Sequence, residues 1–285
     1  MTTVAVVTGA AGAMGSACAR ALAPDVDVML LTDVDGRIED VGAGIAHDSD
    51  TAVYTALGDI GDLGFVANLA SRAGELGELH SLVHTAGLSP SMAGWREILR
   101  VDLASVATLL DAFLPRVVRG SAAVCLASVS GHMGAFDPDM DALLDDPLAP
   151  DLDARFRAAH GDEPDPGATY RLAKRAVIRL CTRAAVAWGR QGGRVVSLSP
   201  GLIDTGMGRL ELQHNPIKTW MSEITPVRTH ESGSDTVLPG RTDDIARTVA
   251  FLCSEGASFI SGCDVLVDGG LIAAMSNQDQ RQSPT

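Results

Sequence analysis

Tyr170 and Lys174 have the residue types and the spacing to carry out proton transfer. They lie four residues apart at the start of an apolar helical pattern that runs to Trp188. Residues at this spacing share one face of a helix, so the lysine ammonium can hold the pKa of the phenol below its ordinary value of about 10. A phenol tuned in this way can exchange a proton near neutral pH. Because such pairs also occur on solvated helix faces, the surrounding elements must distinguish a catalytic pair from a surface contact.

A glycine-rich turn near the N-terminus predicts a nucleotide site. An apolar run typical of a strand buried on both faces precedes Gly9, and Gly12 and Gly15 lead from it into a helical pattern. Such a turn lets backbone amides approach a pyrophosphate at the positive end of a helix. A second apolar strand, residues 26–32, ends at Asp33, where an acid accepts ribose hydroxyls and repels a 2′-phosphate. A tight turn without a ligand is the alternative, but the whole pattern favours NAD over NADP.

Strands and helices alternate along most of the chain, which predicts one α/β domain over residues 1–275. The expected fold is a single-domain, Rossmann-type, doubly wound parallel sheet of about seven strands, with helices on both faces. The carboxyl ends of parallel strands meet at one edge of the sheet, so we expect Asp33, Asp59, Thr85 and Ser128 to lie together. The expected strands after the first two are residues 52–57, 81–85, 122–127, 194–199 and 265–270.

Three segments interrupt this alternation. Residues 132–168 hold ten acids and five prolines, which predicts an acidic insertion that is mostly solvated, with short helices at 140–144 and 152–159. Residues 208–240 have little regular pattern, and a loop of that length favours a lid over the substrate. Residues 276–285 are predicted to form a polar C-terminal tail.

Composition excludes several functional classes. A net charge of −14 argues against nucleic acid and against anionic membrane surfaces. No uncharged apolar stretch is long enough for a membrane span, and the N-terminus lacks the features of a signal peptide. The seven histidines show no ligand spacing, so no metal is expected. Five widely spaced cysteines without a CxxC motif indicate reduced thiols and a cytoplasmic protein.

These motifs, in this order, resemble the short-chain dehydrogenase/reductase family in its single-domain branch, over residues 3–272. The long separation between Ser128 and Tyr170 is similar to that of the bacterial 3α-hydroxysteroid dehydrogenase/carbonyl reductase subgroup. The resemblance implies an NAD-dependent oxidoreductase that interconverts a hydrophobic secondary alcohol and ketone, with hydroxysteroids among the candidates. It also implies a homodimer or homotetramer, assembled through residues 102–118, residues 170–189 and the closing strand.

The resemblance also implies roles for individual residues. Tyr170 is the acid/base, Lys174 lowers its pKa and holds the nicotinamide ribose, and Ser128 binds the substrate oxygen. The implied cofactor-binding residues are Gly9, Gly12, Ala13, Met14, Gly15, Asp33, Asp59, Ile60, Thr85, Ala86, Gly87, Tyr170, Lys174, Pro200, Gly201, Ile203 and Thr205. Candidates for the wall of the substrate pocket, each also compatible with ordinary packing, are Leu88, His132, Met133, Leu202, Met207 and Trp220.

The chain departs from the family pattern at three positions. Ala13 stands where a glycine is usual, and Thr85 where an asparagine is usual. Asp102 occupies the position of a fourth catalytic residue, also an asparagine in the family. Its carboxylate either alters the proton relay near Lys174 or is a conventional acid on a helix surface.

Two other functions fit parts of the sequence. The spacing of Gly9, Gly12 and Gly15 is also that of sugar-nucleotide epimerases and dehydratases, but the absence of a substantial substrate domain after Thr205 counts against that class. A catalytically degenerate protein that binds or senses a dinucleotide is supported only by Asp102.

Overall fold

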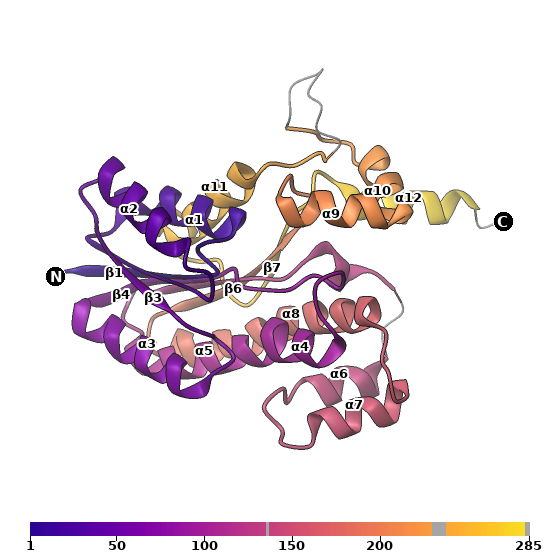
Figure 1. Ribbon diagram of the computed structural model, residues 1–285, viewed down its shortest axis with the longest axis horizontal. Helices are drawn as coiled ribbons and strands as arrows, with labels where there is room; N and C mark the ends of the chain where they lie inside the picture. The colour runs from indigo at the N-terminus through magenta and orange to yellow at the C-terminus, as the bar shows by residue number, and fades with distance from the viewer. Residues whose placement is uncertain (135–136, 230–237, 283–285) are drawn as a thin grey trace.

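The computed structural model describes residues 1–134, 137–229 and 238–282, and this part of the chain contains one sheet of seven parallel strands (Figure 1). The strand order is β3-β2-β1-β4-β5-β6-β7, so the direction of winding reverses between β1 and β4. Such a reversal opens a crevice at the carboxyl ends of the two central strands. The strands are β1 (Thr3–Thr8), β2 (Val28–Asp33), β3 (Ala52–Leu57), β4 (Glu78–His84), β5 (Ala122–Leu126), β6 (Arg194–Pro200) and β7 (Asp264–Val267).

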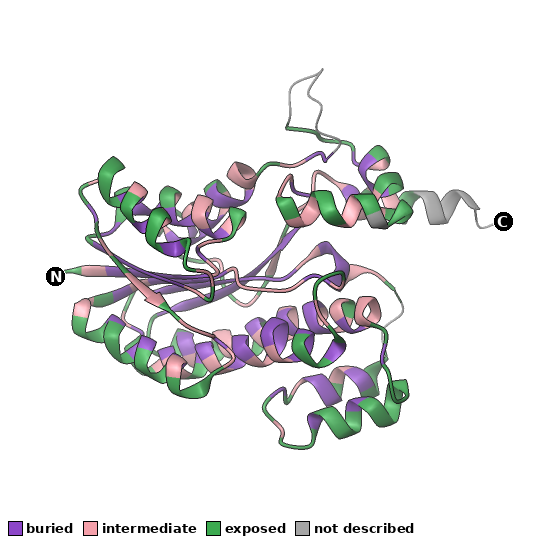
Figure 2. Ribbon diagram, in the orientation of Figure 1, coloured by how far each residue is buried: buried purple, intermediate pink, exposed green. Residues whose placement is uncertain are grey.

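Helices cover both faces of the sheet, which confirms the predicted doubly wound fold. Alternate residues of β1 belong to different core clusters, Val4 and Val6 to one and Ala5 and Val7 to the other. Because both faces are covered, the five inner strands β2, β1, β4, β5 and β6 are almost entirely buried and lack polar alternation, whereas the edge strands β3 and β7 are partly exposed (Figure 2). One face carries α1 (Ala13–Leu22), α2 (Ile38–Asp48) and α11 (Thr242–Cys253), and the other α3 (Leu63–Leu76), α5 (Ser105–Phe113) and α8 (Pro166–Arg190) (Figure 1).

The helical run before β5 is not a uniform α-helix. It begins as α4 (Trp95–Leu99), widens into a π-helical segment over Arg100–Ala104, and continues as α5. A π-helical turn adds a residue to the turn and often occurs at functional sites. Here it contains the fully buried Asp102. Apolar spacing predicts the helix but not this change in hydrogen bonding. Short 3₁₀ turns occupy Ala23–Asp25, Leu114–Arg116, Val129–His132 and Glu255–Ala257.

Most described residues of the acidic insertion are exposed, as predicted, and both predicted short helices are present, but their apolar side chains pack against the protein. Its helices α6 (Pro138–Leu144) and α7 (Leu152–His160) lie outside α4 and α8 (Figure 1). Phe156 is fully buried and stacks on Trp95 at 5.7 Å between ring centroids. Two paired hydrogen bonds, of 2.8 and 2.7 Å, join Arg175 of α8 to Asp141. The insertion therefore covers one side of α8, as a small extension of the core.

Asp145 of the insertion forms ion pairs with two arginines of α8, and its charge should therefore stabilise the fold. It pairs with Arg179 and Arg183 of α8, and hydrogen bonding to Arg179 holds the pKa of the Asp145 carboxyl below its ordinary value. Because the carboxylate is partly exposed, we expect Asp145→Asn to lower the free energy of unfolding by about 1 kcal/mol. Urea unfolding at neutral pH would measure the difference.

The matched control is Asp146→Asn, which removes an exposed neighbouring charge. Because the pKa of Asp145 is lower in the folded state, its carboxylate stabilises the fold at pH values above the unfolded pKa of about 3.9. This stabilisation is lost as the pH falls through the folded-state pKa. The difference between Asp145→Asn and wild type should therefore disappear in acid. Equal stability of both variants at neutral pH would contradict a role for the arginine contacts.

The segment predicted to be a loop at 208–240 contains two helices, α9 (Gly206–His214) and α10 (Pro216–Ile224); its residues 230–237 lie outside the described part of the chain. The side chains of Thr205 and Asn215 cap these helices by accepting hydrogen bonds from Gly208 and Ile217 amides. The predicted polar tail, residues 276–285, is helical as far as residue 282, where it forms the end of α12 (Leu271–Gln282). Among the described residues, no helix has the length and apolar character needed to cross a membrane.

Candidate active site

A cleft of about 630 Å³ opens at the carboxyl ends of the central strands. The glycine turn after β1 forms one wall. Gly9 has a φ of +69°, and a Cβ on it would lie 2.5 Å from the Ala86 amide nitrogen, so only glycine fits there. Gly12 is the N-cap of α1 and has no side chain to cap the first amides of that helix. Bare amides at a helix N-terminus fit the pyrophosphate of a dinucleotide.

Asp33 and Asp59 line the same cleft. Asp33 is held in place by two amides: its Oδ2 accepts from Ala11 at 2.9 Å and its Oδ1 from Asp35 at 3.0 Å. Asp59 pairs with Arg100 at 2.9 Å. Buried Ile60 also lines the cleft. The fixed carboxylate of Asp33 and this apolar surface fit the ribose and adenine of a nucleotide.

The segment after β4 joins the cofactor cleft to the buried centre. Thr85 Oγ1 donates to the Thr8 carbonyl at 2.8 Å, which ties β4 to the glycine turn. This contact gives the threonine a structural role at the position where an asparagine was expected. A Cβ on Gly87 would lie 2.5 Å from Asp102 Oδ1. The backbone thus passes directly over the Asp102 carboxylate.

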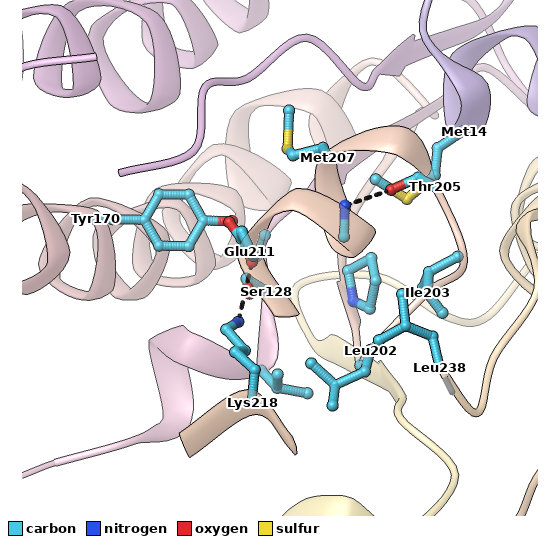
Figure 3. Close-up of a pocket in the computed structure, with 15 residues that line it drawn as sticks. Met14, Ser128, Tyr170, Leu202, Ile203, Thr205, Met207, Glu211, Lys218 and Leu238 are labelled. Atoms are coloured by element: carbon cyan, nitrogen blue, oxygen red, sulfur yellow. Dashed lines mark hydrogen bonds and ion pairs between the residues drawn. The ribbon is translucent and has the colours of Figure 1, made fainter. Parts of the chain in front are cut away.

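Tyr170, Ser128 and Lys174 come together beyond the cleft, as the sequence predicted from their motif. Ser128 follows β5 and lines the same small pocket as Tyr170, whose hydroxyl points toward it in Figure 3. The Lys174 ammonium lies 5.6 Å from the centroid of the Tyr170 ring. It also donates to the Leu126 carbonyl at 3.3 Å. Two hydroxyls and one ammonium therefore converge where a substrate oxygen can be held.

Asp102 is the direct partner of Lys174. Its Oδ1 lies 3.0 Å from Lys174 Nζ, and it accepts from the Leu88 amide at 3.1 Å. The interpretation of Asp102 as a surface acid is wrong, because the side chain has no exposed area. Burial raises the pKa of the Asp102 carboxyl, although Lys174 opposes this effect. Burial acts to lower the pKa of Lys174, but the attraction of Asp102 and Tyr170 outweighs it and raises that pKa.

The pKa of Tyr170 differs from the predicted direction. Burial raises the pKa of the phenol, and the negative charges of Asp102 and Glu211 add to that effect. Lys174 acts to lower this pKa, as the spacing predicted, and the neighbouring Ser128 adds to that effect, but together they are outweighed. Since its pKa is raised from an ordinary value of about 10, the Tyr170 phenol is protonated at neutral pH.

A smaller pocket of about 80 Å³ lies beside Tyr170 and Ser128. It shares Met14, Thr205 and Met207 with the cofactor cleft. Most predicted cofactor residues line one of these two cavities. Gly9, Gly12, Ala13, Gly15, Asp33, Asp59, Ile60, Thr85, Ala86 and Gly87 line the cleft, and Pro200, Gly201 and Ile203 line the pocket.

The predicted substrate wall is only partly present. Leu202 and Met207 line the pocket, whereas Leu88 lines the cofactor cleft. The other three residues line neither cavity. His132 Nε2 lies 2.8 Å from Asp264 Oδ2 at β7, Met133 packs against the buried cluster of α10 and α12, and Trp220 is exposed.

The sequence did not identify Glu211 and Lys218, which also line the pocket. Glu211 Oε2 lies 3.2 Å from Lys218 Nζ, and both side chains are largely buried (Figure 3). They belong to α9 and α10, within the segment predicted to be the lid. That assignment was the only signal for them, because the two residues meet through the packing of two separate helices.

Comparison with known proteins identifies the family. The family model described as "short chain dehydrogenase" matches residues 3–137, and one described as "Enoyl-(Acyl carrier protein) reductase" matches residues 156–272. The 3-alpha-hydroxysteroid dehydrogenase/carbonyl reductase of Comamonas testosteroni is 29% identical over 68% of this chain and 73% of its own length. The meso-2,3-butanediol dehydrogenase of Serratia marcescens is 28% identical over 95% of each chain.

A solved short-chain dehydrogenase/reductase from Serratia marcescens BCRC 10948 has the same fold, with a TM-score of 0.73 over 94% of this chain and 97% of that one, at 19% identity. The gap between the two family matches falls within the acidic insertion. Members of the matched family bind a nicotinamide dinucleotide. The glycine cleft, the convergence of Ser128 and Tyr170, and these matches lead to one conclusion: the chain belongs to the short-chain dehydrogenase/reductase family of oxidoreductases that act on CH–OH groups.

Proposed function

We propose that this protein uses NAD to interconvert a secondary alcohol and a ketone, with Tyr170 as the acid/base. The observation that carries the proposal is that Ser128 and Tyr170 line one pocket, with Lys174 against the Tyr170 ring, beside a cleft that Asp33 lines. This arrangement offers two polar contacts to one substrate oxygen. Leu202, Met207 and Leu238 offer apolar surface to its carbon frame.

The bound nicotinamide would supply the hydride chemistry at the substrate carbon. Ser128 would hydrogen-bond the substrate oxygen and stabilise the charge that develops there. Tyr170 would give its proton to that oxygen in ketone reduction and take it back in alcohol oxidation. The positive charge of Lys174 would favour the phenolate form of Tyr170. Ile203 and Thr205 would hold the carboxamide, since both line the pocket next to Tyr170.

Reduction of NAD at a panel of secondary alcohols would test this function. The panel includes hydroxysteroids, which the family resemblance places among the candidates, together with small aliphatic alcohols and diols. We expect NADH formation, followed by absorbance, with at least one of them. Binding of NAD without turnover of any alcohol, and of NADH without turnover of the matching ketones, would favour a catalytically degenerate dinucleotide-binding protein instead.

Asp33 should determine the choice of cofactor. Because a carboxylate accepts two ribose hydroxyls and repels a 2′-phosphate, we expect Asp33→Asn to lower kcat/KM for NAD by about 10-fold or more, as a charged hydrogen bond is worth roughly 1.5–3 kcal/mol. The ratio of NAD to NADP activity should fall further. Steady-state kinetics with both cofactors would measure this change. Asp35→Asn is the control, since that side chain pairs with Arg37; a clear preference of the wild type for NADP would contradict the assignment.

The assembly and location of the protein are part of the same proposal. We propose a homodimer or homotetramer in which the insertion, by covering one side of α8, restricts the contacts that helix can make. The cysteines are free thiols in the structure, and four of them are buried, which supports a reducing, cytoplasmic environment.

A further inference from the structure

An ion pair occupies the wall of the substrate pocket. Glu211 of α9 and Lys218 of α10 lie 3.2 Å apart, and each side chain is 19% exposed. We name these two residues the pocket ion pair. It lies among apolar side chains, including Leu202 and Leu238 (Figure 3). A carboxylate and an ammonium so placed have lost much of their hydration.

The pocket ion pair lies close to the reacting groups. Glu211 lines the same small pocket as Ser128 and Tyr170, and Figure 3 shows the Tyr170 hydroxyl pointing toward it. Its charge acts on the phenol strongly enough to help raise the pKa of Tyr170. The pocket ion pair therefore borders the space that is open to the atoms next to a substrate oxygen held by Ser128 and Tyr170.

The chemistry of the pair restricts what can lie against it. An apolar group would remove water from the carboxylate and the ammonium without replacing its hydrogen bonds, and each unsatisfied buried group is costly. A hydroxyl has one donor and two acceptor positions. It can donate to Glu211 and accept from Lys218 at once, in charge-assisted hydrogen bonds. A substrate carboxylate would be repelled by Glu211, and a substrate ammonium would be repelled by Lys218.

We propose that the pocket ion pair selects substrates with a second hydroxyl on the carbon next to the reacting one, that is, vicinal diols and the corresponding α-hydroxy ketones. The proposal rests on the function proposed above and specifies its substrate class. In the oxidation, the C–H bond of the reacting carbon loses its hydride to NAD and the O–H bond loses its proton to Tyr170. The second hydroxyl stays intact and serves only for recognition.

The test compares 2,3-butanediol with 2-butanol, which differ only in the second hydroxyl. With NAD in excess, we expect the wild type to favour the diol at least 10-fold in kcat/KM. The double variant Glu211→Gln/Lys218→Met removes both charges and should lose most of this preference. The preference is measured as the ratio of the two kcat/KM values, because a change in the pKa of Tyr170 affects both alcohols alike. Arg209→Met is the matched control. Arg209 also lies on α9 and forms an ion pair, with Asp204, but it is not among the residues that line the pocket. This variant should keep the preference for the diol.

The outcomes separate this inference from the proposed function. Equal activity on the two alcohols, or a preference for 3-hydroxybutanoate or a hydroxysteroid over the diol, would overturn the inference while leaving the dehydrogenase function in place. No turnover of any alcohol or ketone would reject both. A diol preference that survives in the double variant would show that other residues recognise the second hydroxyl, and would also overturn the inference. NAD binding by each variant, measured by calorimetry, verifies that it is folded.

Discussion

Tyr170→Phe is expected to lower kcat/KM for alcohol oxidation by about 10²–10⁴-fold, the usual contribution of a positioned acid/base. Phenylalanine keeps the ring and its packing but has no proton to exchange and no hydroxyl for Ser128. Affinity for NAD should change little, because the cleft from Gly9 to Thr205 is intact. Steady-state kinetics and calorimetric titration with NAD would measure the two effects separately.

The chain supplies a matched control, since its only other tyrosine is Tyr54, on β3 and exposed. Tyr54→Phe should leave turnover unchanged. If Tyr170→Phe kept wild-type turnover, proton exchange would have to come from another group, and the proposed mechanism would be wrong.

The pH profile should follow the ionisation of Tyr170. Oxidation needs the phenolate, so its rate is expected to rise with pH toward the raised pKa of this residue. Reduction needs the phenol and should fall over the same range. Because Glu211 contributes to raising that pKa, Glu211→Gln should move the rising limb of oxidation to lower pH. A limb that stayed in place would mean that the titrating group is not Tyr170.

Asp102→Leu is expected to lower the free energy of unfolding by about 3–5 kcal/mol, because it leaves the Lys174 ammonium buried without its charged partner. It also removes the acceptor of the Leu88 amide. Urea unfolding would measure the loss. The double variant Asp102→Leu/Lys174→Met, which removes both charges, should lose less stability than the single variant. Additive losses would show that the pair contributes no coupling energy.

Asp102→Asn separates shape from charge at this site. An asparagine oxygen can still accept from the Leu88 amide, but it carries no charge to hold Lys174. We expect a smaller loss of stability than in Asp102→Leu, with turnover retained. Turnover equal to that of the wild type would remove Asp102 as an argument for a catalytically degenerate protein.

The sequence by itself determined the fold and the order of its functional motifs. Apolar runs alternate with helical patterns, and parallel strands place their carboxyl ends at one edge of the sheet. Asp33 and Ser128 therefore lie at the site because each stands at or just after the carboxyl end of a parallel strand. Tyr170 and Lys174 are neighbours through the local geometry of one helix. Each of these features depends on local pattern and topology, which a sequence encodes directly.

Only the tertiary structure decided which charges are buried and which charges they pair with. Asp102 has the same local pattern whether it faces solvent or Lys174, and the π-helical turn that holds it inward is invisible in apolar spacing. The pKa of Tyr170 is raised instead of lowered, because burial and two carboxylates that are far from it in the sequence, Asp102 and Glu211, outweigh Lys174. Glu211 and Lys218 meet through the packing of separate helices. Desolvation and Coulomb energies depend on distances through space, and these are fixed only when the elements pack together.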